Sequence, residues 1–468
     1  MLTYQDLLEV PENDLKARLD FVKKAIDDHK RSEAYQIAFD AEEYFKNKNT
    51  TIMNFQKMLY TISGKAVPDN WSANYKMSSH FFRRFVIHEV QYLLGNGVSW
   101  TNKATEGKIG NEKYPFDSQL QKLGKKALTM GCGFGFFNVD HIEVFDFLEF
   151  VPLYDEENGT LSSGIRYWRI APNKPLRATL YEKDGYTDYI WRNDEEGAIL
   201  HEKRAYILKV QHTEADGTEI YDQENYPDFP IVPMWGNSDH ISEFVGLKEQ
   251  IDCYDLIKSG FANTVDEASI VYWTLTNAGG MDNIDLAKFV QKLKTVHAAT
   301  LEDQAQAQSH VVDPPFASRE ALLQRLEKDL YKDAMALNTE AIASGAVTAT
   351  QIKAAYEPLN SKVDDFEYCV INFIKGILKL AGIEDEPTFT RSGIANASEE
   401  IQNVIQSASY LDEEYVTRKI LGILGDGDQA DRVLERKDAE NMERFNDQST
   451  DYEDEEENEQ QEDNRRLS

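Results

Sequence analysis

The amino-acid sequence predicts an α+β fold for this chain of 468 residues, and three observations lead to that prediction. Apolar residues recur at helical spacing near the N-terminus and over most of the second half of the chain. Between residues 131 and 210, short apolar or alternating runs separated by turn residues indicate an antiparallel sheet. From Ser238 to Gly382, long amphipathic helices alternate with an insert and a loop. Helices and antiparallel strands that occupy separate stretches are typical of α+β proteins.

The N-terminal half supplies a mixed body of helices and strands. Residues 1–40 have helical periodicity, and Phe81–Leu94 forms a further helix that the Gly-Asn-Gly turn at 95–97 ends. Phe116–Met130 is also predicted to be helical, and the strand-rich residues 131–210 follow it. These elements together predict one large α+β body.

Two amphipathic helices come next, with an insert between them. The first covers Ser242–Ala268, and the second begins after Ser318 as its N-cap and ends at Leu337. Each helix has one apolar face, so each needs a partner surface. The intervening residues 269–317 contain β-like runs, a Gly-Gly turn and a short helical segment, which predict a small α/β insertion.

A loop of small residues and one very long helix follow. Residues 338–349 are rich in Ala, Ser, Gly and Thr and have almost no bulk. Thr350–Leu380 keeps helical spacing over a length on the order of 50 Å, at about 1.5 Å per residue. We expect Pro358 to kink this helix, because an interior proline removes a hydrogen bond and clashes with the preceding turn. Beyond Gly382, two or three more helices are predicted up to residue 445.

Several of these segments resemble the portal proteins of tailed bacteriophages, in particular the family of many siphophages of Gram-positive hosts. The resemblance lies in the order and spacing of short segments, because each alone is a common apolar pattern. The matching segments are Ala41–Ile52, Asn74–Val98, Phe229–Leu275, Leu323–Lys332 and the run SGAVTATQIKAAYEPL at Ser344–Leu359 with the helix that continues from it.

The resemblance implies a portal fold with an α/β wing, a two-helix stem, a small α/β clip, a long kinked helix and a helical crown. The implied divisions are the wing at 1–237, the first stem helix at 238–268, the clip at 269–317, the second stem helix at 318–337, the tunnel loop at 338–349, the long kinked wing helix at 350–382 and the crown at 383–445. Residues 446–468 are predicted to be a disordered acidic tail, because they combine many carboxylates with few apolar residues.

The resemblance also implies a function and a set of partners. Portal proteins form a ring, dodecameric in the virion, at one capsid vertex. Double-stranded DNA is packaged and ejected through the ring, which is the head-tail connector. The terminase large subunit docks on it during DNA packaging and the head-completion adaptor docks on it later, and the major capsid and scaffolding proteins are further partners. We therefore expect the protein in the virion, and in the host cytoplasm during assembly.

Two sets of contact residues follow from the resemblance. The first is the tunnel loop, expected to touch passing DNA, and its alternative is a plain connector between helices; its residues are Asn338, Thr339, Ser344, Gly345 and Thr348. The second is Lys288, Lys292 and Lys294 in the clip, expected to meet DNA, the motor or the adaptor. For these lysines a solvated helix face is an equally good interpretation.

The net charge of −32, from 82 acidic and 50 basic residues, argues against a protein that grips nucleic acid through counterion release. The imbalance remains when the acidic tail is set aside. A conduit must let duplex DNA move, and a wall of acids, amides and small hydroxyls repels phosphates or only brushes them. The composition therefore favours passage of DNA without a grip.

No catalytic, cofactor or metal site is predicted, and no enzymatic activity is expected. Gly159–Gly164 has phosphate-loop glycine spacing without the following Lys-Ser/Thr, and Gly131–Gly135 is followed by a strand instead of a helix, so a hairpin turn and a strand start are the better interpretations. His80 and His88 lack metalloprotease spacing. The acidic triplets at 155–157, 194–196 and 412–414 fit loops or helix starts.

Other functions stay open at this stage. A phage-encoded metal-dependent nuclease or an NTPase would need clustered carboxylates or a phosphate loop, and a head-assembly or scaffolding factor would never form rings. No transmembrane helix and no signal peptide are predicted, so no membrane partner is expected. Cys132, Cys253 and Cys369 are widely spaced in apolar surroundings and are predicted to be buried thiols without disulfides or zinc.

Overall fold

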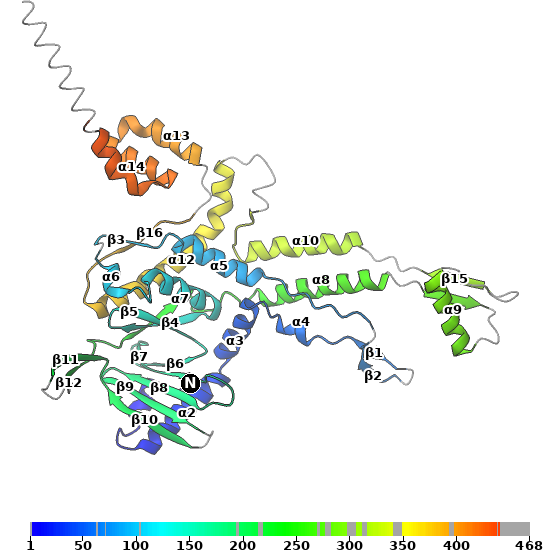
Figure 1. Ribbon diagram of the computed structural model, residues 1–468, viewed down its shortest axis with the longest axis horizontal. Helices are drawn as coiled ribbons and strands as arrows, with labels where there is room; N and C mark the ends of the chain where they lie inside the picture. Colours follow the sequence, from blue (N-terminus) through cyan, green and yellow to red (C-terminus); the bar gives the residue numbers. More distant parts are fainter. Residues whose placement is uncertain are drawn as a thin grey trace, which may run out of the picture. The chain divides into compact units, whose positions relative to one another are not determined.

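A computed structural model describes residues 2–61, 64–70, 72–102, 104–192, 196–213, 219–268, 272–276, 282–296, 306–310, 316–339, 349–392, 397–437 and 439. These residues form two compact units. The first comprises Met1–Thr339 and Tyr356–Ser392, and the second comprises Glu340–Ala355 and Gly393–Ser468. Helices and antiparallel strands build the first unit (Figure 1), so the predicted α+β class is confirmed.

One layer of the first unit is a five-stranded antiparallel meander, with its strands in the order β10-β9-β8-β7-β6. The strands are β6 (Phe150–Tyr154), β7 (Leu161–Trp168), β8 (Leu176–Glu182), β9 (Gly185–Trp191) and β10 (Gly197–Arg204). The predicted antiparallel sheet region is thus confirmed, and each neighbour along the chain is also the neighbour in the sheet.

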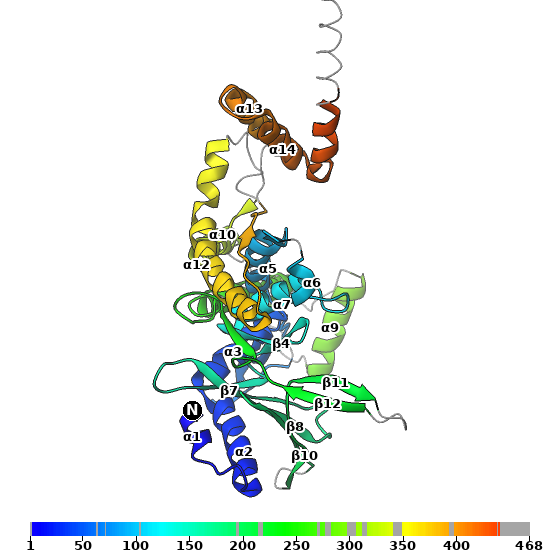
Figure 2. The same ribbon diagram turned by 90° about the vertical axis from the view of Figure 1, so that its left-hand side faces the viewer.

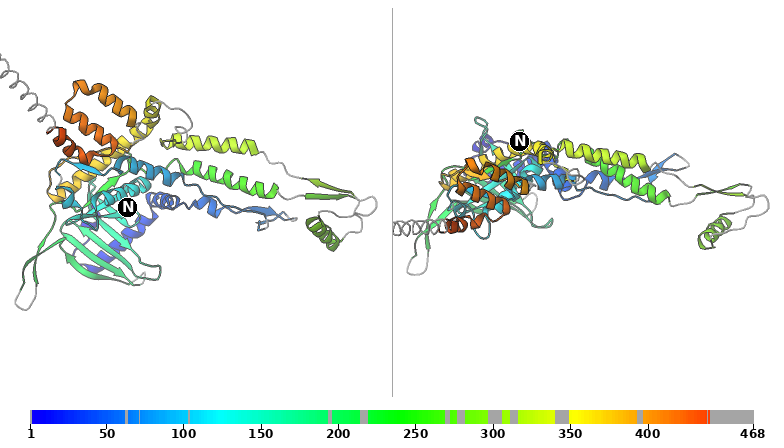
Figure 3. Two further views of the ribbon diagram at one scale, coloured as in Figure 1. Left: turned by 45° about the horizontal axis from the view of Figure 1, so that its top comes forward. Right: turned by 90° about the horizontal axis from the view of Figure 1, so that it is seen from above.

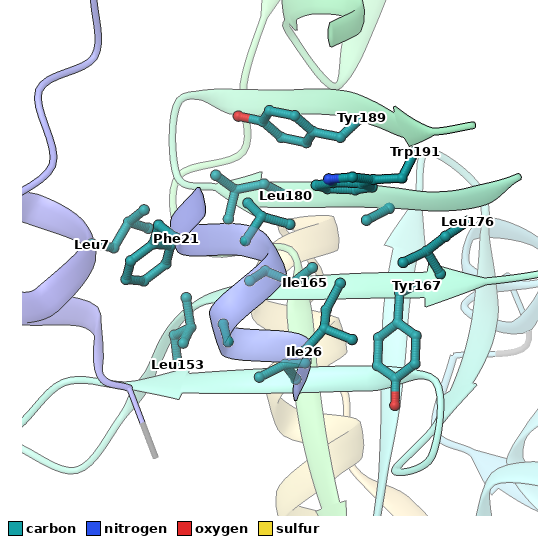
Figure 4. Packing of buried hydrophobic residues seen from close by; sticks show 14 residues of the cluster. Leu7, Phe21, Ile26, Leu153, Ile165, Tyr167, Leu176, Leu180, Tyr189 and Trp191 are labelled. Carbon is teal, nitrogen blue, oxygen red and sulfur yellow. The ribbon is translucent and has the colours of Figure 1, made fainter. Parts of the chain in front are cut away.

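Helix α2 (Leu15–Arg31) covers one face of this sheet (Figures 2 and 4). Asp14 caps the helix by accepting the N–H of Ala17 at 3.0 Å, which satisfies one of the free donors of the first turn. Apolar side chains of α1 (Tyr4–Leu8) and α2 meet the sheet in one buried cluster, which includes Leu7, Phe21, Ile26, Ile165, Leu180, Tyr189 and Trp191. Apolar residues at helical spacing and apolar residues at alternate positions of the strands therefore form one core.

A second layer is the three-stranded antiparallel sheet β13-β4-β5. Its strands are β4 (Cys132–Asn138), β5 (His141–Asp146) and β13 (Ile231–Trp235). Three helices lie beside this sheet: α5 (Phe81–Leu94), α7 (Phe116–Met130) and α12 (Ala349–Ala381). A Cβ added to Gly135 of β4 would lie only 2.5 Å from Cζ of Phe373, so α12 rests directly on the backbone of this strand.

Short two-stranded ladders and helices complete the first unit. The ladders are β1 (Met58–Tyr60) with β2 (Ala66–Pro68), β3 (Val98–Trp100) with β16 (Pro387–Phe389), β11 (Ile207–Thr213) with β12 (Glu219–Glu224) and β14 (Tyr272–Thr276) with β15 (Gln306–His310). The remaining helices are α3 (Glu33–Phe45), α4 (Thr50–Asn54), α6 (Glu106–Ile109), α8 (Lys248–Ala268), α9 (Asn283–Val296) and α10 (Phe316–Asp333). Strands β14 and β15 with α9 agree with the predicted α/β composition of the insert.

The boundaries of the two helices that were predicted for the stem differ from the prediction. Helix α8 begins at Lys248 instead of Ser242, because Gly246 has a φ of +86° and the preceding residues form tight turns such as Leu247 N–H to the Phe244 carbonyl at 3.1 Å. Phe244 and Leu247 are nevertheless buried, so the apolar pattern there reports burial and not helix. Helix α10 begins at Phe316, which places Ser318 inside the first turn and not at the N-cap.

The long helix is present close to its predicted bounds. Helix α12 spans Ala349–Ala381 and contains Pro358, in agreement with the expected helix; the kink itself stays a prediction. The residues directly after Gly382 are not helical, because β16 pairs with β3, and the first unit continues to Ser392; the assignment of the following helices to a crown stays a prediction. The predicted acidic tail lies outside the described residues.

The second unit contains short helices after residue 396. They are α13 (Ala397–Ser407), the 3-10 turn η1 (Ala408–Tyr410), α14 (Glu413–Leu424) and the 3-10 turn η2 (Gly427–Gln429). Gly425 ends α14 in the left-handed conformation, with a φ of +83°. The predicted helices and the Gly425–Gly427 break are therefore present.

We predict that Gly135→Ala destabilises the first unit by about 1–3 kcal/mol, because the added methyl group would overlap Phe373 and push α12 away from β4. Chemical unfolding followed by circular dichroism would measure the change. Gly107→Ala on α6 is the matched control, since no atom lies within 4 Å of its added Cβ. Equal stability of the two variants would contradict the close contact.

Candidate functional site

The two helices expected to form the stem, α8 and α10, lie side by side and antiparallel (Figures 1 and 3). At one end, Gln250 Nε2 donates to Asp333 Oδ2 at 2.7 Å. At the other end, Arg319 Nη1 donates to Thr264 Oγ1 at 2.7 Å and to the Gly260 carbonyl at 3.3 Å. These polar contacts at both ends fix the register of the pair, while only Leu330 of α10 is fully buried among the described side chains of that helix.

An aromatic cluster attaches the base of the pair to α5. The Phe81 ring lies edge-on to Tyr254 of α8, with 5.0 Å between centroids, and to Tyr331 of α10 at 6.1 Å. The ring of Phe85 also lies edge-on to Tyr331, at 5.3 Å. Edge-to-face pairs at these distances are favourable. One turn of α5 therefore holds both α8 and α10.

A polar ladder runs along another face of α8. The backbone N–H groups of Ser79, Met77 and Tyr75 donate to Asp255 Oδ1 at 2.9 Å, Ser259 Oγ at 3.0 Å and Asn263 Oδ1 at 2.7 Å. We call residues 72–80, which form neither helix nor strand, the strap.

The spacing of the acceptors along α8 matches the spacing of the N–H donors along the strap. Four helical residues rise about 6 Å, and two residues of extended chain advance about 6.6 Å. Acceptors at every fourth position of α8 can therefore meet alternate N–H groups of an antiparallel extended segment. This ladder was not predicted, although polar residues at i, i+4 and i+8 within an apolar helical pattern are a signal visible in the sequence.

The ladder begins at a buried carboxylate. Asp255 is fully buried and also accepts Asn49 Nδ2 at 2.8 Å. Burial raises the pKa of Asp255, while the hydrogen bonds from Asn49 and Ser79 oppose that shift. One turn earlier, Asp252 accepts Thr51 Oγ1 at 2.8 Å and pairs with Lys248 at 3.2 Å. Asn49 and Thr51, which precede the strap in the sequence, thus also form hydrogen bonds to α8.

A buried ammonium group joins four parts of the chain near the base of the α8–α10 pair. Lys362 Nζ on α12 lies 2.8 Å from Glu89 Oε2 on α5 and 2.7 Å from Glu243 Oε2 before α8, and it donates to the Ala334 carbonyl after α10 at 3.3 Å. Burial alone would lower the pKa of Lys362, but the two carboxylates raise it above its ordinary value. Burial raises the pKa of Glu89 to about 7, against the opposing effect of Lys362. The ammonium group therefore stays charged.

The predicted tunnel-loop residues are only partly described. Asn338 is half-buried and Thr339 is exposed, and both follow α10. Ser344, Gly345 and Thr348 lie outside the described residues. Only these two of the five residues are therefore described, directly after α10, and contact of the loop with DNA stays a prediction.

The three predicted clip lysines all lie on α9. Lys288 and Lys292 are exposed, and Lys288 Nζ lies 3.7 Å from Asp285 one turn away. An exposed pair of this kind contributes little to stability. The side chain of Lys294 lies outside the described residues, so contact with DNA or a protein partner stays a prediction for all three.

The motifs that were set aside have the expected local structures. Gly159, with a φ of +69°, forms the turn between β6 and β7, and Gly131 ends α7 directly before β4. His80 is the N-cap of α5, and burial lowers the pKa of His88. Among the described residues, no cluster of three or more His, Cys, Asp or Glu side chains could hold a metal ion.

The acidic triplets and cysteines complete this comparison. Asp155 accepts the N–H of Glu157 at 2.8 Å in an exposed turn, and Asp412 is the N-cap of α14. Asp194 and Glu195 lie outside the described residues.

Cys132 and Cys369 are buried as predicted, but Cys253 is exposed on α8, so that prediction was wrong. At helical spacing from Cys253, Leu256 and Ile257 are apolar but Glu249 and Gln250 are polar, and Leu256 is itself exposed, so the apolar residues here do not mark burial. No helix within the described ranges combines the length and apolar character needed to cross a bilayer.

The sequence of this chain is similar to one protein family and to two portal proteins. A family model described as phage portal protein, SPP1 Gp6-like, matches residues 23–443. The portal protein of Clostridium phage phiCD119 is 22% identical over 417 residues, which cover 82% of this chain and 88% of the relative. The portal protein of Bacillus phage SPP1 is 23% identical over 415 residues, which cover 83% of this chain and 80% of the relative.

Solved structures with a similar chain come from GTA particles. A chain from the neck of an empty GTA particle, computed with C6 symmetry, is 11% identical with a TM-score of 0.44, and the match covers 74% of this chain and 90% of that one. A chain from the neck of a native GTA particle, computed with C12 symmetry, is 12% identical with a TM-score of 0.42, covering 73% and 89%.

We predict that Lys362→Met lowers the free energy of unfolding by about 3–5 kcal/mol, because it leaves buried carboxylates without their counter-charge. Lys379→Met is the matched control: Lys379 pairs with Asp228 at 2.9 Å but its side chain is 70% exposed, so its loss costs about 1 kcal/mol or less. Urea unfolding would compare the two. Adding Glu89→Gln to Lys362→Met should recover part of the loss, and a failure to recover any would contradict the electrostatic explanation.

Proposed function

Because this chain belongs to the SPP1 Gp6-like family of phage portal proteins, we propose that its copies close into a ring, dodecameric in the virion, at one capsid vertex. Double-stranded DNA passes through the centre of the ring when the capsid is filled and again when it is emptied. The observation that carries this proposal is the family match over residues 23–443, which leaves few residues outside it. In a cyclic ring each copy uses two different surfaces, and the uncovered faces of α8 and α10 suit that need.

The pair of α8 and α10 forms the wall of the channel in this proposal. A channel wall has to keep its direction while DNA moves past it. The strap ladder, the aromatic cluster on α5 and the Lys362 cluster support such a role, because each ties the pair to the body of the subunit by a different kind of interaction.

Passage without a grip fits the charge of the chain. A net charge of −32 opposes tight binding of phosphates, so DNA contacts are weak and brief. The work of DNA movement then belongs to the motor. We assign no covalent step to this chain, and the family's role as a component of the particle needs none.

The clip is the docking site for other proteins in this proposal. Strands β14 and β15 with α9 lie between α8 and α10 in the sequence, so they follow one stem helix and precede the other. The terminase large subunit would bind there during DNA packaging and the head-completion adaptor would replace it afterwards. The exposed Lys288 and Lys292 support this assignment, since the partners then meet cations on a strongly acidic chain.

We predict that electron microscopy of the purified full-length protein shows end-on rings with a central hole. The assembly should appear as the concentration rises, because ring closure is a mass-action process. A chain that stays monomeric at every concentration in mass photometry would contradict the proposed portal ring and would favour a head-assembly factor.

We predict that Gly345→Trp impairs filling of capsids with DNA and leaves ring formation unchanged, because a bulky side chain would narrow the channel at the tunnel loop. The measurement is the DNA content of particles assembled with the variant, alongside electron microscopy of its rings. Gly107→Trp on the exposed surface of α6 is the control. Normal DNA content with Gly345→Trp would count against the tunnel-loop role.

A further inference from the structure

An uncovered groove runs along α8 between the strap and α10. Its volume is about 520 Å³. Leu256, Ile257 and Gly260 of α8 contribute to its lining, together with Tyr75 of the strap and Leu322 of α10. Leu256, Leu322 and Tyr75 are 43%, 45% and 53% exposed, which is high for large apolar side chains that sit next to one another.

Gly260 is the most informative residue of this groove. It lies in the interior of α8, where glycine weakens a helix relative to alanine. A Cβ added there would meet no described atom within 4 Å beyond its own helical turn. The fold of the single subunit therefore gives no reason for a glycine at this position. Close approach by another molecule would give one, because glycine lets a backbone be approached directly.

The groove is also unusual in charge. Among its described lining residues there are three basic side chains and no carboxylate, in a chain that has 82 acids and 50 bases. Lys76 donates to the Met53 carbonyl, and Arg319 donates to the Gly260 carbonyl and to Thr264 Oγ1. These acceptors are neutral, so the positive charge of both side chains remains available at the groove.

We infer that this groove receives a second copy of the same chain, so that the face of α8 with Cys253, Leu256 and Gly260 is a subunit interface and not part of the channel lining. The inference rests on the proposed ring and adds which face of the stem is covered. A neighbouring copy offers both properties that the groove needs: apolar stem residues for its floor, and a strongly acidic surface for its basic rim.

DNA fits the groove less well. Its phosphates are hydrated and gain from cations, but they gain nothing from a floor of Leu256, Ile257 and the bare backbone at Gly260. A copy of the chain covers that floor and removes it from water, which is favourable. The apolar floor therefore decides between the two occupants.

The chain has a native reporter for this face. Cys253 precedes Leu256 by three residues and Gly260 by seven, which places the three on one side of α8. It is exposed in the subunit, whereas Cys132 and Cys369 are buried. A maleimide added to native protein should therefore react with Cys253 first.

The first experiment compares maleimide labelling of rings and of single subunits, separated by size-exclusion chromatography. We expect Cys253 to react at least about tenfold more slowly in the ring. Cys253→Ser supplies the background from the buried thiols. Equal rates in rings and subunits would overturn the inference while the ring itself stands. Protection that appears only when DNA fills the channel would also overturn it, because the face would then line the channel.

The second experiment measures assembly of Gly260→Leu by mass photometry. The substitution fills the groove where the neighbour should approach, and we expect the concentration needed for rings to rise at least about tenfold. Leucine favours helix more than glycine, so the variant subunit should fold at least as well, and its thermal unfolding checks this. Gly107→Leu on α6, also open to solvent, is the matched control and should assemble like the wild type.

The outcomes separate this inference from the proposed function. Normal rings from Gly260→Leu would overturn the assigned interface and leave the portal ring intact. A wild-type chain that never forms rings would overturn both. Loss of rings with Gly260→Leu, normal rings with Gly107→Leu and slow labelling of Cys253 would together support the assignment.

Discussion

The ion cluster of Lys362 is the constraint on which the arrangement of the first unit depends. One ammonium group contacts carboxylates from α5 and from the segment before α8 and a carbonyl after α10, while it belongs to α12 itself. A buried ion cluster adds little net stability, but removal of one member is costly. Its value here is geometric, because the charges match only when all four elements are in place. Apolar surfaces alone would tolerate several ways of setting α12 against the rest.

Both polar and apolar contacts hold α8 and α10 in place. Aromatic rings of α5 hold the base of both helices, the strap supplies directional hydrogen bonds to one face of α8, and α10 covers another face. A face of α8 remains uncovered at Leu256 and Gly260. A helix that is held on several faces and uncovered on one apolar face fits the subunit interface inferred above.

Sequence reasoning went far for this chain because its strongest signals are periodic. The apolar spacing of Thr350–Leu380 predicted α12 closely, and the family was recognisable from the order of short segments. The predictions failed where apolar residues at helical spacing do not lie in a helix, and where contacts join distant parts of the chain. Phe244 and Leu247 follow the helical pattern but lie in turns, because Gly246 adopts a positive φ. The pairing of β16 with β3 joins residues almost three hundred positions apart, and the Lys362 cluster joins four segments; no local pattern encodes such contacts.

The strap ladder has a consequence for how this protein can change over time. Its donors are the amides of Tyr75, Met77 and Ser79, and every amino acid except proline carries that group. The acceptors are side chains of α8, where Asp255, Ser259 and Asn263 cannot be exchanged for alanine without loss of a bond. These three bonds therefore constrain the two partners differently: at positions 75, 77 and 79 of the strap they exclude only proline, whereas in α8 they require an acceptor oxygen at every fourth position.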